Sequence, residues 1–89
     1  MKAVITVVGK DTVGILAKVS AICAEYNANI IDVSQTVLQD MFCMIMLVQT
    51  HKMTADIGQL RNVLEEMGKK ANLQIHVMHE DLFNSMHRI

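Results

Sequence analysis

Short apolar runs alternate along this chain with stretches in which apolar residues recur every three or four positions. The first run, residues 2–8, is rich in β-branched side chains and too short for a typical helix, so it predicts a strand buried on both faces. From Thr12 to Tyr26 the apolar residues follow helical spacing, and the Thr12 hydroxyl is in position to cap this helix. A strand followed directly by a helix is therefore predicted.

Two more strands are predicted after a turn at residues 27–29. Residues 31–37 alternate between apolar and polar, which is typical of a half-buried strand with one face in water. Residues 41–48 are apolar at every position, which favours a place in the middle of a sheet. Because only Gln39 and Asp40 and their immediate neighbours separate the two runs, we expect a β-hairpin.

The remaining residues predict a helix, a strand and a short helix. Helical spacing covers residues 54–70, with Thr54 as the predicted cap and two lysines near the C-terminal end. Residues 73–78 alternate again and predict a fourth strand. Residues 81–89 contain three apolar positions that suit a short terminal helix.

This element order, βαββαβ with a C-terminal extension, indicates a particular topology. Two right-handed crossovers place both long helices on one face of a four-stranded antiparallel sheet. We therefore predict an α+β, ferredoxin-like fold in a single domain over residues 1–89, with a short C-terminal helix. In that topology the strand at residues 31–37 lies at an edge of the sheet.

Composition and charge narrow the possible partners. Hydrophobic residues make up 52% of the 89 residues and aromatic residues only 3%, so Val, Ile, Leu and eight Met must fill the core, and the apolar surplus predicts a partner chain. A formal charge of -1 gives no long-range attraction for nucleic acid.

No apolar run reaches the roughly 20 residues that cross a bilayer, and the N-terminus lacks a signal-peptide pattern. We expect a cytoplasmic protein with no nucleic-acid or membrane contact, in which Cys23 and Cys43 are reduced and buried.

Residues 9–16 join the first strand to the first helix through two glycines and an acid. The first N–H groups of a helix have no partner within the helix, and Gly14 has no side chain to block an approach to them. This loop is a candidate site for a small anionic or zwitterionic ligand.

The chain resembles the ACT domain, a small amino-acid-sensing module of metabolic regulators. The residues that carry the resemblance are Asp11, Thr12, Val13, Gly14 and Ile15 at the junction, Val19 in the helix, Asn29 and Ile30 at the start of the second strand, and the apolar third strand. ACT domains usually have Pro where this chain has Val13. The chain is similar in particular to proteins made of one ACT domain and to the ACT repeats of the glycine cleavage repressor family.

The resemblance implies a regulatory module that has no catalytic activity and no cofactor. Effectors of such domains, commonly amino acids, bind at dimer interfaces between the first loop of one subunit and the start of the second strand of the other. The implied ligand-binding residues are Asp11, Thr12, Val13, Gly14, Ile15, Asn29 and Ile30. The implied partners are a second copy, paired through the strand at residues 31–37, and an unidentified protein target.

Other proteins with this order of strands and helices have different functions, and the residues of this chain fit those functions less well. An acylphosphatase-type enzyme needs a cationic side chain in the first loop to hold phosphate, and residues 9–16 contain Lys10 but no Arg. RNA binding needs aromatic residues on the central strands, where only Phe42 is present, and a metal carrier needs paired cysteines in the first loop. His76 and His79 point to opposite faces of a strand, so no catalytic or metal-binding residue is predicted.

A dimerisation module without a ligand remains the alternative. In that case Asp11 forms a turn, Gly14 allows close packing, and Asn29 occupies its position because Asn tolerates a left-handed backbone. Many ACT domains keep the fold and only associate, so the resemblance leaves this alternative open.

Overall fold

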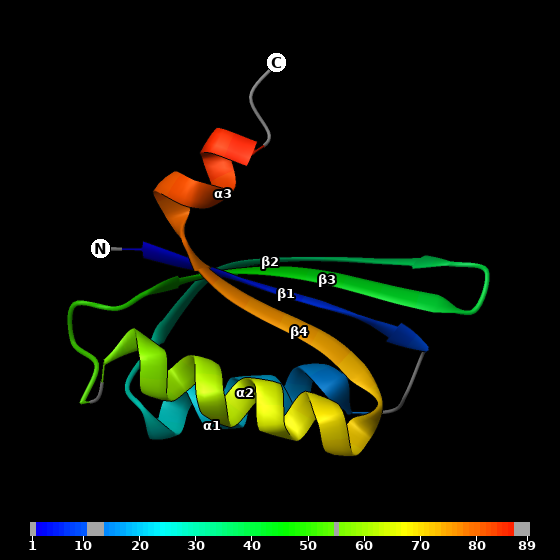
Figure 1. The fold of residues 1–89 in the computed structure, drawn as a ribbon, viewed down its shortest axis with the longest axis horizontal. Helices are drawn as coiled ribbons and strands as arrows, with labels where there is room; N and C mark the ends of the chain where they lie inside the picture. The colour runs from blue at the N-terminus through cyan, green and yellow to red at the C-terminus, as the bar shows by residue number, and fades with distance from the viewer. Residues whose placement is uncertain (1, 11–13, 55, 87–89) are drawn as a thin grey trace.

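The computed structural model describes residues 2–10, 14–54 and 56–86. In chain order they form β1 (Lys2–Lys10), α1 (Ile15–Glu25), β2 (Asn29–Leu38), β3 (Met41–Gln49), α2 (Ile57–Ala71), β4 (Leu73–His79) and α3 (Glu80–Met86). This is the predicted βαββαβ order followed by a short helix (Figure 1).

The strands form one antiparallel sheet in the order β2-β3-β1-β4. Helices α1 and α2 cover one face, and α3 stands on the opposite face near the start of β1 (Figure 1). The predicted ferredoxin-like fold is confirmed, with β2 at an edge and the all-apolar β3 in the interior of the sheet. We call the face opposite α1 and α2 the open face.

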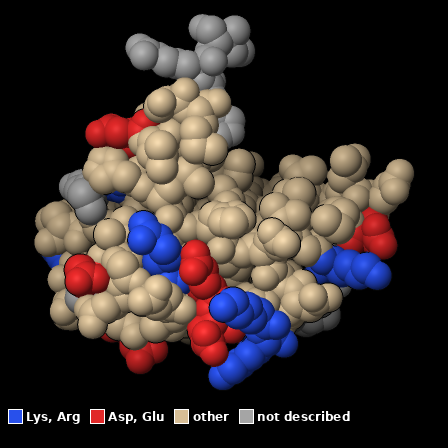
Figure 2. Space-filling model, viewed as in Figure 1, with Lys and Arg blue, Asp and Glu red and all other residues tan. Residues whose placement is uncertain are grey.

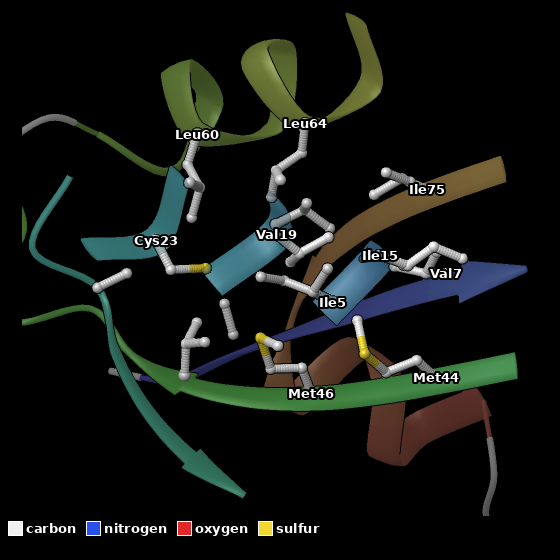
Figure 3. Close-up of a cluster of buried hydrophobic side chains, with 14 of the residues drawn as sticks. Ile5, Val7, Ile15, Val19, Cys23, Met44, Met46, Leu60, Leu64 and Ile75 are labelled. Carbon is white, nitrogen blue, oxygen red and sulfur yellow. The ribbon is translucent and has the colours of Figure 1, made fainter. Parts of the chain in front are cut away.

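The core lies between the sheet and the two long helices (Figure 3). Met44 and Met46 of β3 are fully buried there and fill space that aromatic residues occupy in many other cores. Burying each large apolar side chain contributes about 1.5–3 kcal/mol. The other large side chains of this cluster are Ile5, Val7, Ile15, Val19, Phe42, Val48, Leu60, Leu64, Leu73, Ile75 and Val77.

Burial on the open face is less complete than the sequence predicts. Val4 is only 3% exposed, because α3 packs against this end of β1. Thr6 and Val8, further along β1, are half-buried, so the strand is not buried along both faces as expected. The same holds for the cysteines: Cys23 is buried in the core as predicted, but Cys43 is only half-buried, on the open face.

Strand β2 is not the half-buried strand that its alternation predicts. Only Ile30 and Val33 are partly buried, whereas Val37 is 54% exposed. A bulge between Ile30 and Asp32 leaves Ile31 as an extra residue and breaks the alternation. The outer half of the β2–β3 hairpin also extends beyond the helices, which leaves Val37 more than half exposed (Figure 1).

Both helices begin later than predicted. The N-cap of α1 is Gly14 rather than Thr12, and its φ of 84° is a left-handed conformation that glycine adopts readily. The N-cap of α2 is Asp56 rather than Thr54. Asp56 is followed three residues later by Gln59, and the two make a capping box that fixes the start of α2 there.

Candidate functional site

The predicted ligand residues lie in two groups, one at each end of α1. Three of them, Asp11, Thr12 and Val13, lie outside the described residues. Gly14 is exposed at the N-terminal end of α1, and its carbonyl accepts the first hydrogen bond of the helix at 3.0 Å. The Ile15 side chain is buried in the core, so a ligand at this end meets backbone groups rather than that side chain.

Asn29 and Ile30 lie at the other end of α1. Asn29 begins β2 with an exposed side chain, and Ile30 faces the helix layer and is partly buried. The helix between Gly14 and Asn29 has 11 residues and is therefore about 16 Å long. Among the described residues, a single chain therefore does not bring Gly14 together with Asn29.

A hollow of about 610 Å³ surrounds Asn29 and Ile30, which is large enough for a small molecule. Its walls come from the second half of α1, the turn after it, the start of β2, the end of β3 and the following loop. Its lining includes Ala24, Asn27, Asn29, Ile30, Gln49 and Lys52.

Backbone contacts hold these walls together. The Thr54 N–H donates to the Tyr26 carbonyl at 3.1 Å, which ties the loop after β3 to the end of α1. The Ala28 N–H donates to the Cys23 carbonyl at 2.8 Å and closes the last turn of that helix. The chain can turn sharply into β2 because Asn27 adopts a left-handed φ of 61°.

Gln49, one of the residues that line the hollow, carries an unusual polar atom. Across residues 2–10, 14–54 and 56–86, its Oε1 is the buried side-chain oxygen or nitrogen that has no hydrogen-bond partner. A buried acceptor left without a donor costs about 1–3 kcal/mol. The register pairs Gln49 with Asn29, and both residues line the hollow, but the Oε1 atom is closed to solvent and does not open into it.

The charges around the hollow favour an anionic group. His51 and Lys52 line it and are exposed, and no acidic side chain of the described residues does. Ala24, Ala28 and Ile30 supply an apolar surface beside them. The hollow therefore combines a cationic side and a small apolar surface.

The described residues offer little for catalysis or metal binding. No group of three or more His, Cys, Asp or Glu side chains among them is placed to hold a metal ion. Burial raises the pKa of the Cys23 thiol to about 11, so the nucleophilic thiolate is scarce at neutral pH. None of the described helices is long and apolar enough to cross a membrane.

Known proteins resemble this chain over most of its length. The family model described as ACT domain matches residues 2–78. A UPF0237 protein of Clostridium perfringens is 53% identical over 89 residues, covering 100% of both chains. An ACT domain protein from Streptococcus pneumoniae has a TM-score of 0.80 at 44% identity, covering 93% of each chain. A putative glycine cleavage system transcriptional repressor has a TM-score of 0.76 at 25% identity, covering 89% of this chain and 47% of that one.

These matches confirm the resemblance that residues 11–15, Asn29 and Ile30 indicate in the sequence. They also confirm the likeness to the glycine cleavage repressor type, in which the matching region is less than half of the longer chain. The family model and the element order agree over nearly the same residues. The chain belongs to the ACT domain family.

Proposed function

We propose that this protein is a cytoplasmic, non-catalytic regulatory module that binds an amino acid between two copies of the chain and thereby modulates a partner protein. The observation that carries the proposal is the hollow beside Asn29, which is lined by the exposed Lys52 and by the apolar Ala24 and Ile30. ACT domains are regulatory modules, so a ligand site of this size suits the family.

An amino acid matches the chemistry of the hollow group by group. In the proposal its carboxylate lies toward Lys52, and its ammonium group donates to the side-chain carbonyl of the exposed Asn29. A small apolar side chain fits against Ala24 and Ile30. In the proposal, Asp11 and the backbone N–H groups that begin α1 in the second copy complete the site from the other side.

Pairing through β2 gives the two copies a suitable arrangement. β2 is an edge strand with no strand of the described residues on its outer side, although its Val33 N–H donates to Asp32 Oδ1 at 2.9 Å and would exchange that bond on pairing. Antiparallel pairing with its own copy makes a continuous eight-stranded sheet and puts Asn29 of one copy level with Leu38 of the other. Leu38 pairs with Met41, and Met41 pairs with Lys10, so that end of the sheet also carries the loop that begins α1.

The test is thermal unfolding in the presence of each common amino acid at millimolar concentration. A ligand that binds only the folded protein raises the melting temperature in proportion to the logarithm of its concentration. We expect at least one amino acid to do so, and expect Asp11→Ala and Asn29→Ala to reduce the shift. The proposal fails if none of the amino acids changes the melting temperature.

The Gln49→Leu variant makes the test sharper. Replacing a buried acceptor that has no partner by an apolar group of similar size leaves the ligand-free protein as stable or more stable. Because Gln49 also lines the hollow, the same variant makes that wall apolar and should weaken the response to the amino acid. Gln74→Leu is the matched control, because Gln74 is exposed on β4 and does not line the hollow.

A dimerisation module without a ligand is the second candidate. It is supported by the uncovered outer half of the hairpin, where Val37 and Leu38 are 54% and 70% exposed beside the free edge of β2. In that case no amino acid stabilises the protein, and Asp11→Ala and Asn29→Ala leave the association state unchanged. Mass measurement by light scattering after gel filtration separates the two candidates.

A further inference from the structure

The hollow beside Asn29 differs in charge from the rest of the surface. The chain as a whole has nine acidic residues and eight Lys and Arg, and Figure 2 shows acidic and basic side chains side by side over the helix layer. A second hollow of about 520 Å³, on α2, follows this mixed pattern, because Glu66 and Lys70 both line it. The hollow beside Asn29 is lined by Lys52 and by no acidic side chain of the described residues.

The basic side chains of this hollow are available to a ligand. His51 and Lys52 are consecutive and exposed in the loop after β3, and neither forms an ion pair or a side-chain hydrogen bond with another described residue. Lys52 carries a full positive charge. The His51 imidazole donates a hydrogen bond through a ring N–H in either protonation state. The loop therefore offers donors to two separate acceptor groups.

The acidic residues nearest along the chain do not line the hollow. Glu25 ends α1 and is absent from the lining. Asp32 lies on the open face of the sheet, and its carboxylate accepts the hydrogen bond from the next N–H of β2. Asp56 is engaged as the N-cap of α2. A ligand in the hollow thus meets a cation and hydrogen-bond donors before any carboxylate of the described residues.

The amino acid of the proposed function leaves part of this lining unused. Its carboxylate and ammonium group take up Lys52 and Asn29, while His51 and the side-chain amide of Asn27 remain as donors. The bond from the Thr54 N–H to the carbonyl of Tyr26, at 3.1 Å, ties the loop that contains His51 to the turn that contains Asn27.

We propose, as a deepening that rests on the proposed function, that the effector is an amino acid whose side chain ends in a second carboxylate. His51 and Asn27 hold this carboxylate, and the one or two methylene groups before it lie against Ala24 and Ile30. A side-chain amide of the same shape keeps the methylene contact but lacks the charge. A basic side chain is repelled by Lys52. The sign of the side-chain charge therefore determines which amino acid binds.

The experiment compares each acidic amino acid with its amide, which has nearly the same shape. In isothermal titration calorimetry we expect L-glutamate to bind about 10-fold more tightly than L-glutamine, or L-aspartate about 10-fold more tightly than L-asparagine, a ratio that corresponds to about 1.4 kcal/mol. His51→Leu should reduce the affinity for the acid to that for its amide. His76→Leu is the matched control and should leave the ratio unchanged, because His76 is exposed on β4 and does not line the hollow.

A lysine variant tests the other carboxylate. Lys52→Met should weaken the binding of the acid and of its amide alike, because Lys52 holds the carboxylate that every amino acid has. Glutarate has two carboxylates and no ammonium group, so it should bind at least about 10-fold more weakly than L-glutamate. Circular dichroism verifies that all the variants are folded.

The outcomes separate this inference from the proposed function. A neutral amino acid that binds as tightly as glutamate and aspartate overturns the inference and leaves the proposed function standing. If no amino acid binds, the proposed function fails and the inference fails with it. Glutarate or inorganic phosphate that binds as tightly as the acidic amino acids would show a general anion site and overturn the inference. A preference for the acid that persists in His51→Leu would also overturn it.

Discussion

Asp56 and Gln59 hold each other at the start of α2. The Asp56 carboxylate accepts a hydrogen bond from the Gln59 backbone N–H at 2.9 Å, and the Gln59 side-chain oxygen accepts one from the Asp56 N–H at 3.2 Å. Asp56→Ala removes the first bond and should lower the free energy of unfolding by about 1 kcal/mol in urea denaturation. Thr54→Ala is the control and should change it little, because Thr54 is not the N-cap of this helix. A larger effect at Thr54 would contradict this assignment.

The turn between β2 and β3 holds a residue in an unfavourable conformation. Gln39 has a φ of 58°, in the left-handed region that side chains other than Asn and Asp disfavour. Gln39→Gly should therefore raise the free energy of unfolding by about 0.5–1 kcal/mol. Thermal unfolding measures this, and Gln35→Gly, within the strand, should do the opposite. A destabilised Gln39→Gly protein would show that the side chain makes a contact worth more than the backbone strain.

Gly68 lets α2 approach the sheet closely. A Cβ at this position would lie 3.0 Å from Ile75 Cγ1 and 3.0 Å from the Leu73 carbonyl oxygen. Alanine is favoured over glycine in a helix by about 1 kcal/mol, yet we expect Gly68→Ala to destabilise the protein by about 1–2 kcal/mol through this overlap. Chemical denaturation gives the value, with the exposed Lys69→Ala as the control. An increase in stability would mean that the helix moves away at little cost.

The thiol of Cys23 makes stability depend on alkaline pH. Its pKa rises from 9.0 to about 11 on folding because of burial. Below pH 9 the thiol keeps its proton in both the folded and the unfolded state. Between pH 9 and 11 the unfolded chain releases the proton and the folded chain does not. The folded state therefore becomes less stable as the pH rises through this range. The loss approaches about 2–3 kcal/mol. The difference in unfolding free energy between the wild type and Cys23→Ala should become smaller from pH 8 to pH 11. A difference that stays constant over this range would contradict the raised pKa of Cys23.

The order of the elements could be predicted because each has its own apolar period. The uninterrupted run at residues 41–48 placed β3 inside the sheet, and the structure has it there. The helix starts could not be located as well, because Thr12 and Thr54 are good capping residues by type. The left-handed Gly14 and the reciprocal bonds of Asp56 decide the boundaries instead.

The environment of β2 and the walls of the hollow depended on long-range geometry. In a regular hairpin that starts from the pair Leu38 and Met41, Gln49 would lie opposite Ile30. The extra residue at Ile31 shifts the register by one, so Gln49 lies opposite Asn29 instead. Nothing in the alternation of residues 31–37 reveals this extra residue. The exposure of Val37 depends on where the helices end, which a local pattern does not contain.

The length of α1 has a consequence for how a ligand would be sensed. Because this helix keeps Gly14 and Asn29 at opposite ends, a ligand that contacts both must be held by two copies. Its apparent affinity then rises with the concentration of the protein itself, and ligand and chain each promote the assembly of the other. Such a module reports the product of two abundances, that of the metabolite and its own.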